Sequence, residues 1–134
     1  MENCNINRGF KKLVVWQDAI DLYVLSSKLL THAPFELKKS FGNCLDACHS
    51  INRNISEGYC RKSIKEYLNF LNIALGSSGE FHSSIYSFLK AEQLSNEDFE
   101  ELDKLHFKLE NGLINLIKSL QKKMKDGTWN DSFV

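Results

Sequence analysis

The stretch CLDACHSINRNISEGYCRKSIKEYLNFLNIALGSSGE, residues 44–80, decides the fold. Apolar residues recur at helical spacing from residue 41 to residue 55, and a second helical pattern begins at residue 67. A short basic connector, Arg61-Lys62, lies between the two patterns. Gly58 directly follows the first pattern, so we expect it to end that helix in a left-handed conformation. The stretch therefore predicts two helices joined by a tight junction.

The segment before this pair, residues 12–33, carries a wide apolar stripe. The central line of the stripe consists of Leu13, Trp16, Ile20, Tyr23, Ser27 and Leu30. The residues that fall away from it, and are therefore expected to be exposed, are Asp18, Asp21 and Lys28. Flanking apolar residues widen the stripe beyond what one neighbour covers, so we expect a second partner, either another helix or another subunit. Pro34 ends this helix by residue 33.

Polar start signals precede the last two helices. Ser63 and Glu66 fit a capping box, in which each side chain binds the other residue's backbone N–H. Ser95 is followed by acidic residues, which suit the positive end of a helix dipole. The apolar stripe that follows is the longest in the chain, and Asp126-Gly127 is expected to end it.

Four amphipathic helices with short connections predict an all-α fold. We expect an up-and-down antiparallel four-helix bundle over residues 11–125. Residues 1–10 show no periodicity and predict a flexible N-terminus. Residues 126–134 form a C-terminal tail whose Trp129 and Phe133 are either docked on the bundle or disordered.

The run Gly76-Ser77-Ser78-Gly79 interrupts the third helical pattern. Each glycine inside a helix costs about 1 kcal/mol relative to alanine. We expect the close approach of a neighbouring helix to offset this cost. A binding cleft or a kink at the same place is the alternative.

Composition excludes several classes of protein. The formal net charge is zero, which argues against strong nonspecific attraction to nucleic acid or to anionic lipid. No apolar run approaches the roughly 20 residues that span a bilayer, and the first residues lack a signal-peptide core. We therefore expect a cytoplasmic protein that does not contact membranes.

The cysteines and histidines favour packing over chemistry. Cys44 and Cys48 share a helix face, with His49 and Cys60 nearby, but zinc-knuckle spacing is absent. We interpret the cysteines as core residues, with a metal site built around Cys44, Cys48 and His49 as the alternative. The four histidines lie far apart in sequence, and no nucleophile motif is present. The sequence therefore predicts no enzyme, no metal and no cofactor.

Charged residues gather at the junction of the second and third helices. Arg53, Glu57 and Arg61 are four residues apart, so they predict an ion-pair network that sets the junction or joins subunits. Glu80 could join this network, and Gly58 and Gly76 belong to the same structural set. The exposed basic residues that could instead bind the phosphates of RNA or DNA are Arg53, Arg61, Lys62 and Lys65.

The middle stretch resembles the bacterial four-helix-bundle proteins related to those encoded in 23S rRNA intervening sequences. This family includes the accessory variability determinant proteins of diversity-generating retroelements. The resemblance covers about residues 10–122 and is carried by Phe10–Ala19, Ser50-Ile51, Asn54–Gly58, Arg61, Tyr67, Phe70-Leu71, Ile73-Ala74, Gly76-Ser77 and Glu80. It implies a four-helix bundle that assembles as a homopentamer. In the retroelement members it implies binding to a reverse transcriptase and to nucleic acid.

The sequence thus favours a non-enzymatic, oligomeric helical scaffold that binds a protein partner. The alternative is an RNA- or DNA-binding accessory protein, associated with an rRNA intervening sequence or a retroelement, that uses the basic patch. Five copies of a small patch would form a ring of charge, which is how a neutral chain can still bind nucleic acid.

Overall fold

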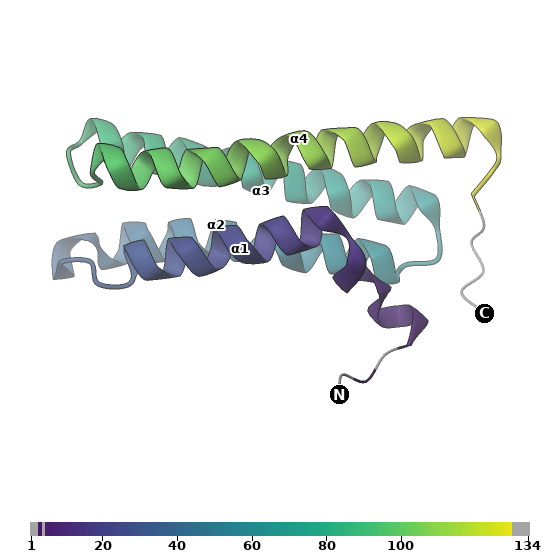
Figure 1. Ribbon diagram of the computed structural model, residues 1–134, viewed down its shortest axis with the longest axis horizontal. Coiled ribbons are helices and arrows are strands. Elements are labelled where there is room, and N and C mark those ends of the chain that lie inside the picture. Colours follow the sequence, from purple (N-terminus) through teal and green to yellow (C-terminus); the bar gives the residue numbers. More distant parts are fainter. Residues whose placement is uncertain (1–2, 4, 130–134) are drawn as a thin grey trace.

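The computed structural model describes residue 3 and residues 5–129 of the chain (Figure 1). In this range all the secondary structure is helical, and no strand is present. The helices are η1 (Ile6–Lys12), α1 (Val14–Leu30), η2 (Phe35–Leu37), α2 (Lys38–Cys60), α3 (Ile64–Lys90) and α4 (Asn96–Asp126). None of the described helices combines the length and the apolar character that a membrane-crossing segment needs.

Helices that follow one another along the chain are also neighbours in space. α2 packs against α1 and α3, and α4 packs against α3 and α1. Within the described residues the backbones of α1 and α3 do not approach each other closely, nor do those of α2 and α4, so these two pairs lie on opposite corners of the bundle. The short connections make successive helices antiparallel, as Figure 1 shows. The predicted all-α class is confirmed.

The predicted starts of the last two helices and the predicted end of the last one are confirmed, but only the Ser63 half of the capping box is present, because the Glu66 carboxylate pairs with Arg61. The Ser63 Oγ accepts a hydrogen bond from the Glu66 backbone N–H at 3.4 Å. The Ser95 Oγ accepts one from Asp98 at 3.1 Å, and both bonds satisfy a donor that the first turn leaves unpaired. Gly127 ends α4 with a φ of 67°, in the left-handed region where glycine has no steric penalty.

Gly58 does not end a helix, so that prediction was wrong. α2 continues to Cys60, and Gly58 is buried inside it. A Cβ at this position would lie 2.8 Å from the Cβ of Phe70 and 3.2 Å from the carbonyl oxygen of Tyr67. The missing side chain therefore lets α2 and α3 approach each other closely, next to the connector that joins them.

Gly76 and Gly79 do not mark a close approach inside the bundle, which corrects a second prediction. A Cβ added to either residue would meet no atom of another element within 4 Å. Both glycines are exposed, and α3 runs through them as one continuous helix from Ile64 to Lys90. Within the described part of the chain, no packing contact therefore offsets the free-energy cost of the two glycines.

The buried side of α1 is rotated relative to the predicted one. Ala19 and Leu22 are fully buried, whereas Trp16 of the predicted central line is only half-buried. Asp18, which was expected to be exposed, is buried, and its Oδ1 lies 3.3 Å from the Nζ of Lys108 on α4. The stripe is apolar on both flanks, so its periodicity does not determine which flank faces the core.

The two ends of the described chain pack on the same end of the bundle. Part of the segment that was expected to be flexible forms η1, and the expected boundary at residue 11 falls inside this helix. The ring of Phe10 lies 6.4 Å from that of Tyr59. Trp129 is partly buried, and its ring lies 6.1 Å from that of Tyr67. At this residue the tail is therefore docked on the bundle, which is one of the two predicted alternatives. Phe133 and Cys4 lie outside the described residues.

We expect Gly58→Ala to destabilise the protein by about 1–2 kcal/mol, because overpacking exceeds the gain in helix propensity. Gly42→Ala is the matched control in the same helix, since a Cβ there meets nothing within 4 Å. That control should be neutral or stabilising by up to about 1 kcal/mol. Urea unfolding followed by circular dichroism measures both changes. Equal effects of the two substitutions would contradict the close approach at Gly58.

Candidate functional site

Arg61 is the centre of the charged group at the α2–α3 junction. Its Nη2 lies 3.2 Å from the Oε1 of Glu57, and its Nη1 lies 3.6 Å from the Oε1 of Glu66. The guanidinium also sits over the ring of Phe70, 5.2 Å from its centroid. These side chains are about half exposed, so each ion pair contributes no more than a few tenths of a kcal/mol. Their main effect is to orient the connector.

Two other predicted members lie apart from this group. No ion pair joins Arg53 to Glu57 among the described side chains; Glu57 pairs with Arg61 instead. Glu80 lies near Cys44, close enough to contribute to the raised pKa of that thiol, and so faces the other half of α2. The observed network thus differs in membership from the predicted one: Glu66 is its third member, in place of Arg53.

Three of the four candidate phosphate-binding residues, Arg61, Lys62 and Lys65, lie at one end of the bundle. The Trp129 Nε1 donates to the carbonyl oxygen of Lys62 at 3.5 Å, which brings the end of α4 to the α2–α3 connector. The Cys60 Sγ donates to the carbonyl oxygen of Asn7 at 3.3 Å, which brings η1 to the same place. The basic residues of these segments are Arg8, Lys11, Lys12, Arg61, Lys62, Lys65, Lys122, Lys123 and Lys125. They outnumber the acids of the same segments, which are Glu57, Glu66 and Asp126.

Charge is therefore distributed unevenly along the bundle axis. The acidic start of α4, residues 97–103, lies at the opposite end, beside the α3–α4 turn. Lys62 and Lys65 are exposed at the basic end. Arg53 is also exposed, but it lies in α2 about two turns before that end. A chain with no net charge thus has one basic end.

A polar cluster joins α3 to α4, and sequence reasoning missed it. The His82 Nε2 lies 2.8 Å from the Oδ1 of Asp103, and the His82 and His106 rings are 4.7 Å apart. One possible ligand atom from each of these three residues lies within 4.8 Å of the other two. The Nε2 of His106 lies 2.9 Å from both the carbonyl oxygen and the Oγ of Ser78. The sequence contains a signal for this cluster: His82 and Asp103 lie at nearly equal sequence distances from the turn that joins α3 to α4, so two antiparallel helices bring them to the same level.

His106 is the buried member of this cluster. Desolvation lowers the pKa of its imidazole below the ordinary value, since burial disfavours the charged form. The hydrogen bond to the Ser78 carbonyl oxygen opposes this shift. Because a carbonyl oxygen only accepts hydrogen bonds, the Nε2 carries the proton and the Nδ1 carries the lone pair.

The cysteine-based metal site is not assembled among the described residues. Cys44 and Cys48 are buried, and burial raises the pKa of each thiol to about 12. Such thiols remain protonated near neutral pH, and among the described residues no third potential ligand joins them. His49 is exposed, and its ring packs beside Tyr23 at 5.1 Å. The packing interpretation of these cysteines is the one that the geometry favours.

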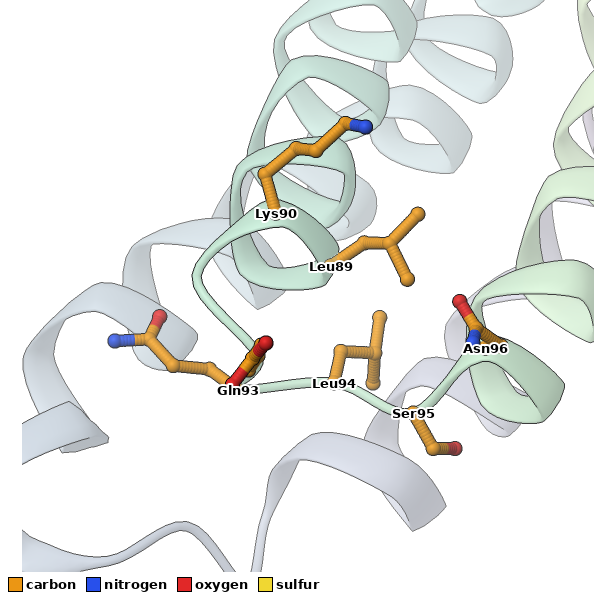
Figure 2. A pocket seen from close by; sticks show the side chains of 7 residues that line it. Leu89, Lys90, Gln93, Leu94, Ser95 and Asn96 are labelled. Carbon is orange, nitrogen blue, oxygen red and sulfur yellow. The ribbon is translucent and has the colours of Figure 1, made fainter.

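The turn between α3 and α4 contains a surface pocket (Figure 2). Its lining residues are Leu89, Lys90, Glu92, Gln93, Leu94, Ser95 and Asn96. Figure 2 shows the side chains of Leu89 and Leu94 next to each other, with Lys90 and Gln93 pointing away from them. The lining contains neither a histidine nor a cysteine, so it has no evident pairing of a nucleophile with a base.

The outer face of α3 carries almost no charge. Between Glu66 and Lys90 the only acidic or basic residue of the helix, histidine apart, is Glu80. The exposed uncharged residues are Asn69, Asn72, Ile73, Gly76, Gly79, Ser83, Tyr86 and Ser87. Ile73 and Tyr86 each keep 47% of their surface exposed. A helix face that contacts only water normally carries more charge than this.

The fold and these clusters define a helical-bundle protein whose described polar groups mainly join its own helices. A family model described as 23S rRNA-intervening sequence protein matches residues 11–115. The chain therefore belongs to the 23S rRNA-intervening sequence protein family, which confirms the resemblance of the middle stretch. The family description specifies no enzymatic activity. A search of curated proteins found no match.

The two buried thiols should resist labelling in the folded protein. At pH 8 a thiol with a pKa of about 12 is ionised in only about one molecule in ten thousand. In a Cys4→Ser/Cys60→Ser variant, we expect a maleimide to label Cys44 and Cys48 at least about 100-fold more slowly than in urea. Labelling followed by mass spectrometry measures the rates. Rapid native labelling would show that the α2 core opens readily.

Proposed function

We propose that this protein is a non-enzymatic scaffold that assembles with copies of itself through the outer face of α3. The observation that carries the proposal is the exposed pair Gly76 and Gly79 in a nearly uncharged helix face. Each glycine destabilises the helix by about 1 kcal/mol, and none of the other described elements packs closely on either. Close approach of a second backbone would offset this cost.

The apolar residues around the glycines support the same proposal. Ile73 and Tyr86 flank the glycine pair along α3, and both remain substantially exposed in one chain. Exposed apolar residues that gather on one face are typical of protein–protein contacts. A surface rich in apolar residues would fit this nearly uncharged face, and α1 offers one.

The wide stripe of α1 provides the complementary face. Trp16, Ile20 and Tyr23 are half-buried, and Val24 keeps 46% of its surface exposed. α1 and α3 lie on opposite corners of the bundle, so these two faces point in different directions. Contact between two different faces generates a ring when the rotation closes. A homopentamer, which the family resemblance implies, is the closed ring that we propose.

An arginine in place of Gly76 should weaken this assembly. We expect Gly76→Arg to raise the dissociation constant at least about 10-fold, because the long side chain holds the two backbones apart. The substitution should not disturb the isolated chain, since the position is open. Light scattering over a range of concentrations measures the assembly.

Gln121→Arg is the matched control, because it adds the same charge at an exposed position of α4. It should leave the oligomer unchanged. A wild-type protein that stays monomeric at micromolar concentration would overturn the proposed scaffold. A stable oligomer that tolerates Gly76→Arg would retain the scaffold but exclude this face of α3.

A second candidate function, binding to RNA or DNA, is favoured by the basic end of the bundle. We propose that Lys62, Lys65 and the lysines of the last α4 turns contact phosphates, with Arg53 at the margin. Arg61 contributes less, since Glu57 and Glu66 already balance its charge. In a ring of parallel bundles the basic ends share one face, which multiplies a modest local charge.

Charge reversal at the basic end tests this candidate. We expect Lys122→Glu/Lys123→Glu to weaken the salt dependence of binding to a fluorescent RNA hairpin. The slope of log K against log salt should fall in magnitude by about 2. Lys38→Glu/Lys39→Glu makes the same charge change at the opposite end and should have little effect. Fluorescence anisotropy over a salt series measures both. Absence of binding to RNA and DNA at low salt would exclude the candidate.

A further inference from the structure

The cluster of His82, Asp103 and His106 has the composition of a transition-metal site. Helical bundles commonly build such sites from side chains on facing helices, often with an acid and a histidine three residues apart. Asp103 and His106 have that spacing on α4, and His82 faces them from α3. No other group of three potential ligands comes together within the described residues.

The distances are compatible with a single bound ion. Zinc lies about 2.0–2.2 Å from histidine nitrogen and carboxylate oxygen, so two tetrahedral ligands are about 3.4 Å apart. The three ligand atoms already lie within 4.8 Å of one another. The side chains of His82 and Asp103 are 37% and 46% exposed, so they have room to close by the remaining ångström or so.

His106 has the second contact that metal-bound histidines normally make. A ligating imidazole usually donates its other N–H to a carboxylate, a backbone carbonyl or water, which fixes the tautomer and the ring. The Nε2 of His106 makes this contact with the carbonyl oxygen of Ser78 at 2.9 Å. A metal bound through the Nδ1 would leave this contact intact, and the contact holds the buried ring in place before the ion arrives.

Aromatic side chains enclose the two histidines. The ring of Phe81 lies 6.2 Å from that of His106, and the ring of Phe99 lies 6.1 Å from that of His82. This apolar surround lowers the local dielectric and strengthens the attraction between a cation and Asp103. Because His82 and Asp103 remain partly exposed, an ion can enter from solvent and keep a water molecule as a further ligand.

We propose that His82, Asp103 and His106 bind one divalent transition-metal ion of the zinc type between α3 and α4. Two imidazoles with one carboxylate favour zinc and its neighbours in the first transition series, whereas magnesium and calcium prefer sites made only of oxygen. The site does not depend on the proposed assembly, because all three ligands come from one chain.

Calorimetric titration of the tag-free, chelator-treated full chain with zinc chloride tests the proposal. We expect one ion per chain, and we expect His82→Ala and Asp103→Asn each to weaken binding at least 10-fold. His82 and Asp103 are chosen because their partial exposure makes loss of folding less of a concern than at buried His106. Circular dichroism of each variant confirms that its helices are retained.

His32→Ala is the matched control, because it removes an exposed histidine elsewhere and should leave the affinity unchanged. Cobalt substitution adds a spectroscopic test: we expect visible d–d bands of a nitrogen–oxygen site without a thiolate-to-cobalt charge-transfer band. No saturable zinc binding would overturn the proposal. Binding that survives both His82→Ala and Asp103→Asn, or a thiolate band, would also overturn it by placing the ion elsewhere.

Discussion

The close approach of α2 and α3 at Gly58 is the constraint on which the rest of the junction depends. A side chain of any size at this position would collide with the fixed Cβ of Phe70 and the backbone of Tyr67. Because the two helices meet here, the three-residue connector can be short, and Arg61 can reach carboxylates on both helices. Tyr67 then contacts both Tyr59 and Trp129, so the close approach at Gly58 also provides the surface on which the end of the described chain packs.

Polar contacts along α3 hold the bundle in register once its helices have met. Ser77 bonds with Ser50 of α2 at 2.8 Å, while the next residue, Ser78, bonds with His106 of α4. Apolar packing tolerates small shifts along a helix axis, whereas a buried hydrogen bond does not, because a displaced donor loses a partner that water cannot replace. The serines of the Gly76–Gly79 run thus face inward and the glycines face outward.

The sequence was sufficient to predict the four long helices and the caps at Ser63, Ser95 and Gly127, because those depend on local periodicity and on residues a few positions apart. It did not predict which flank of the α1 stripe is buried, since both flanks are apolar and the choice depends on α2 and α4. Gly58 was misinterpreted because a glycine after an apolar run is equally compatible with a cap and with a contact. The grouping of His82 with Asp103 and His106 depends on the register of α3 against α4. In the sequence, only the length of the turn between these helices carries information about that register.

The nearly uncharged outer face of α3 also bears on how the protein behaves in concentrated solution. A chain with equal numbers of acidic and basic residues has little long-range repulsion to keep its copies apart. Where such a chain exposes an uncharged, partly apolar helix face, encounters between copies are not opposed by charge. Colloidal stability then depends on specific contacts that cover this face, and an assembly with fixed stoichiometry is the arrangement that limits further growth.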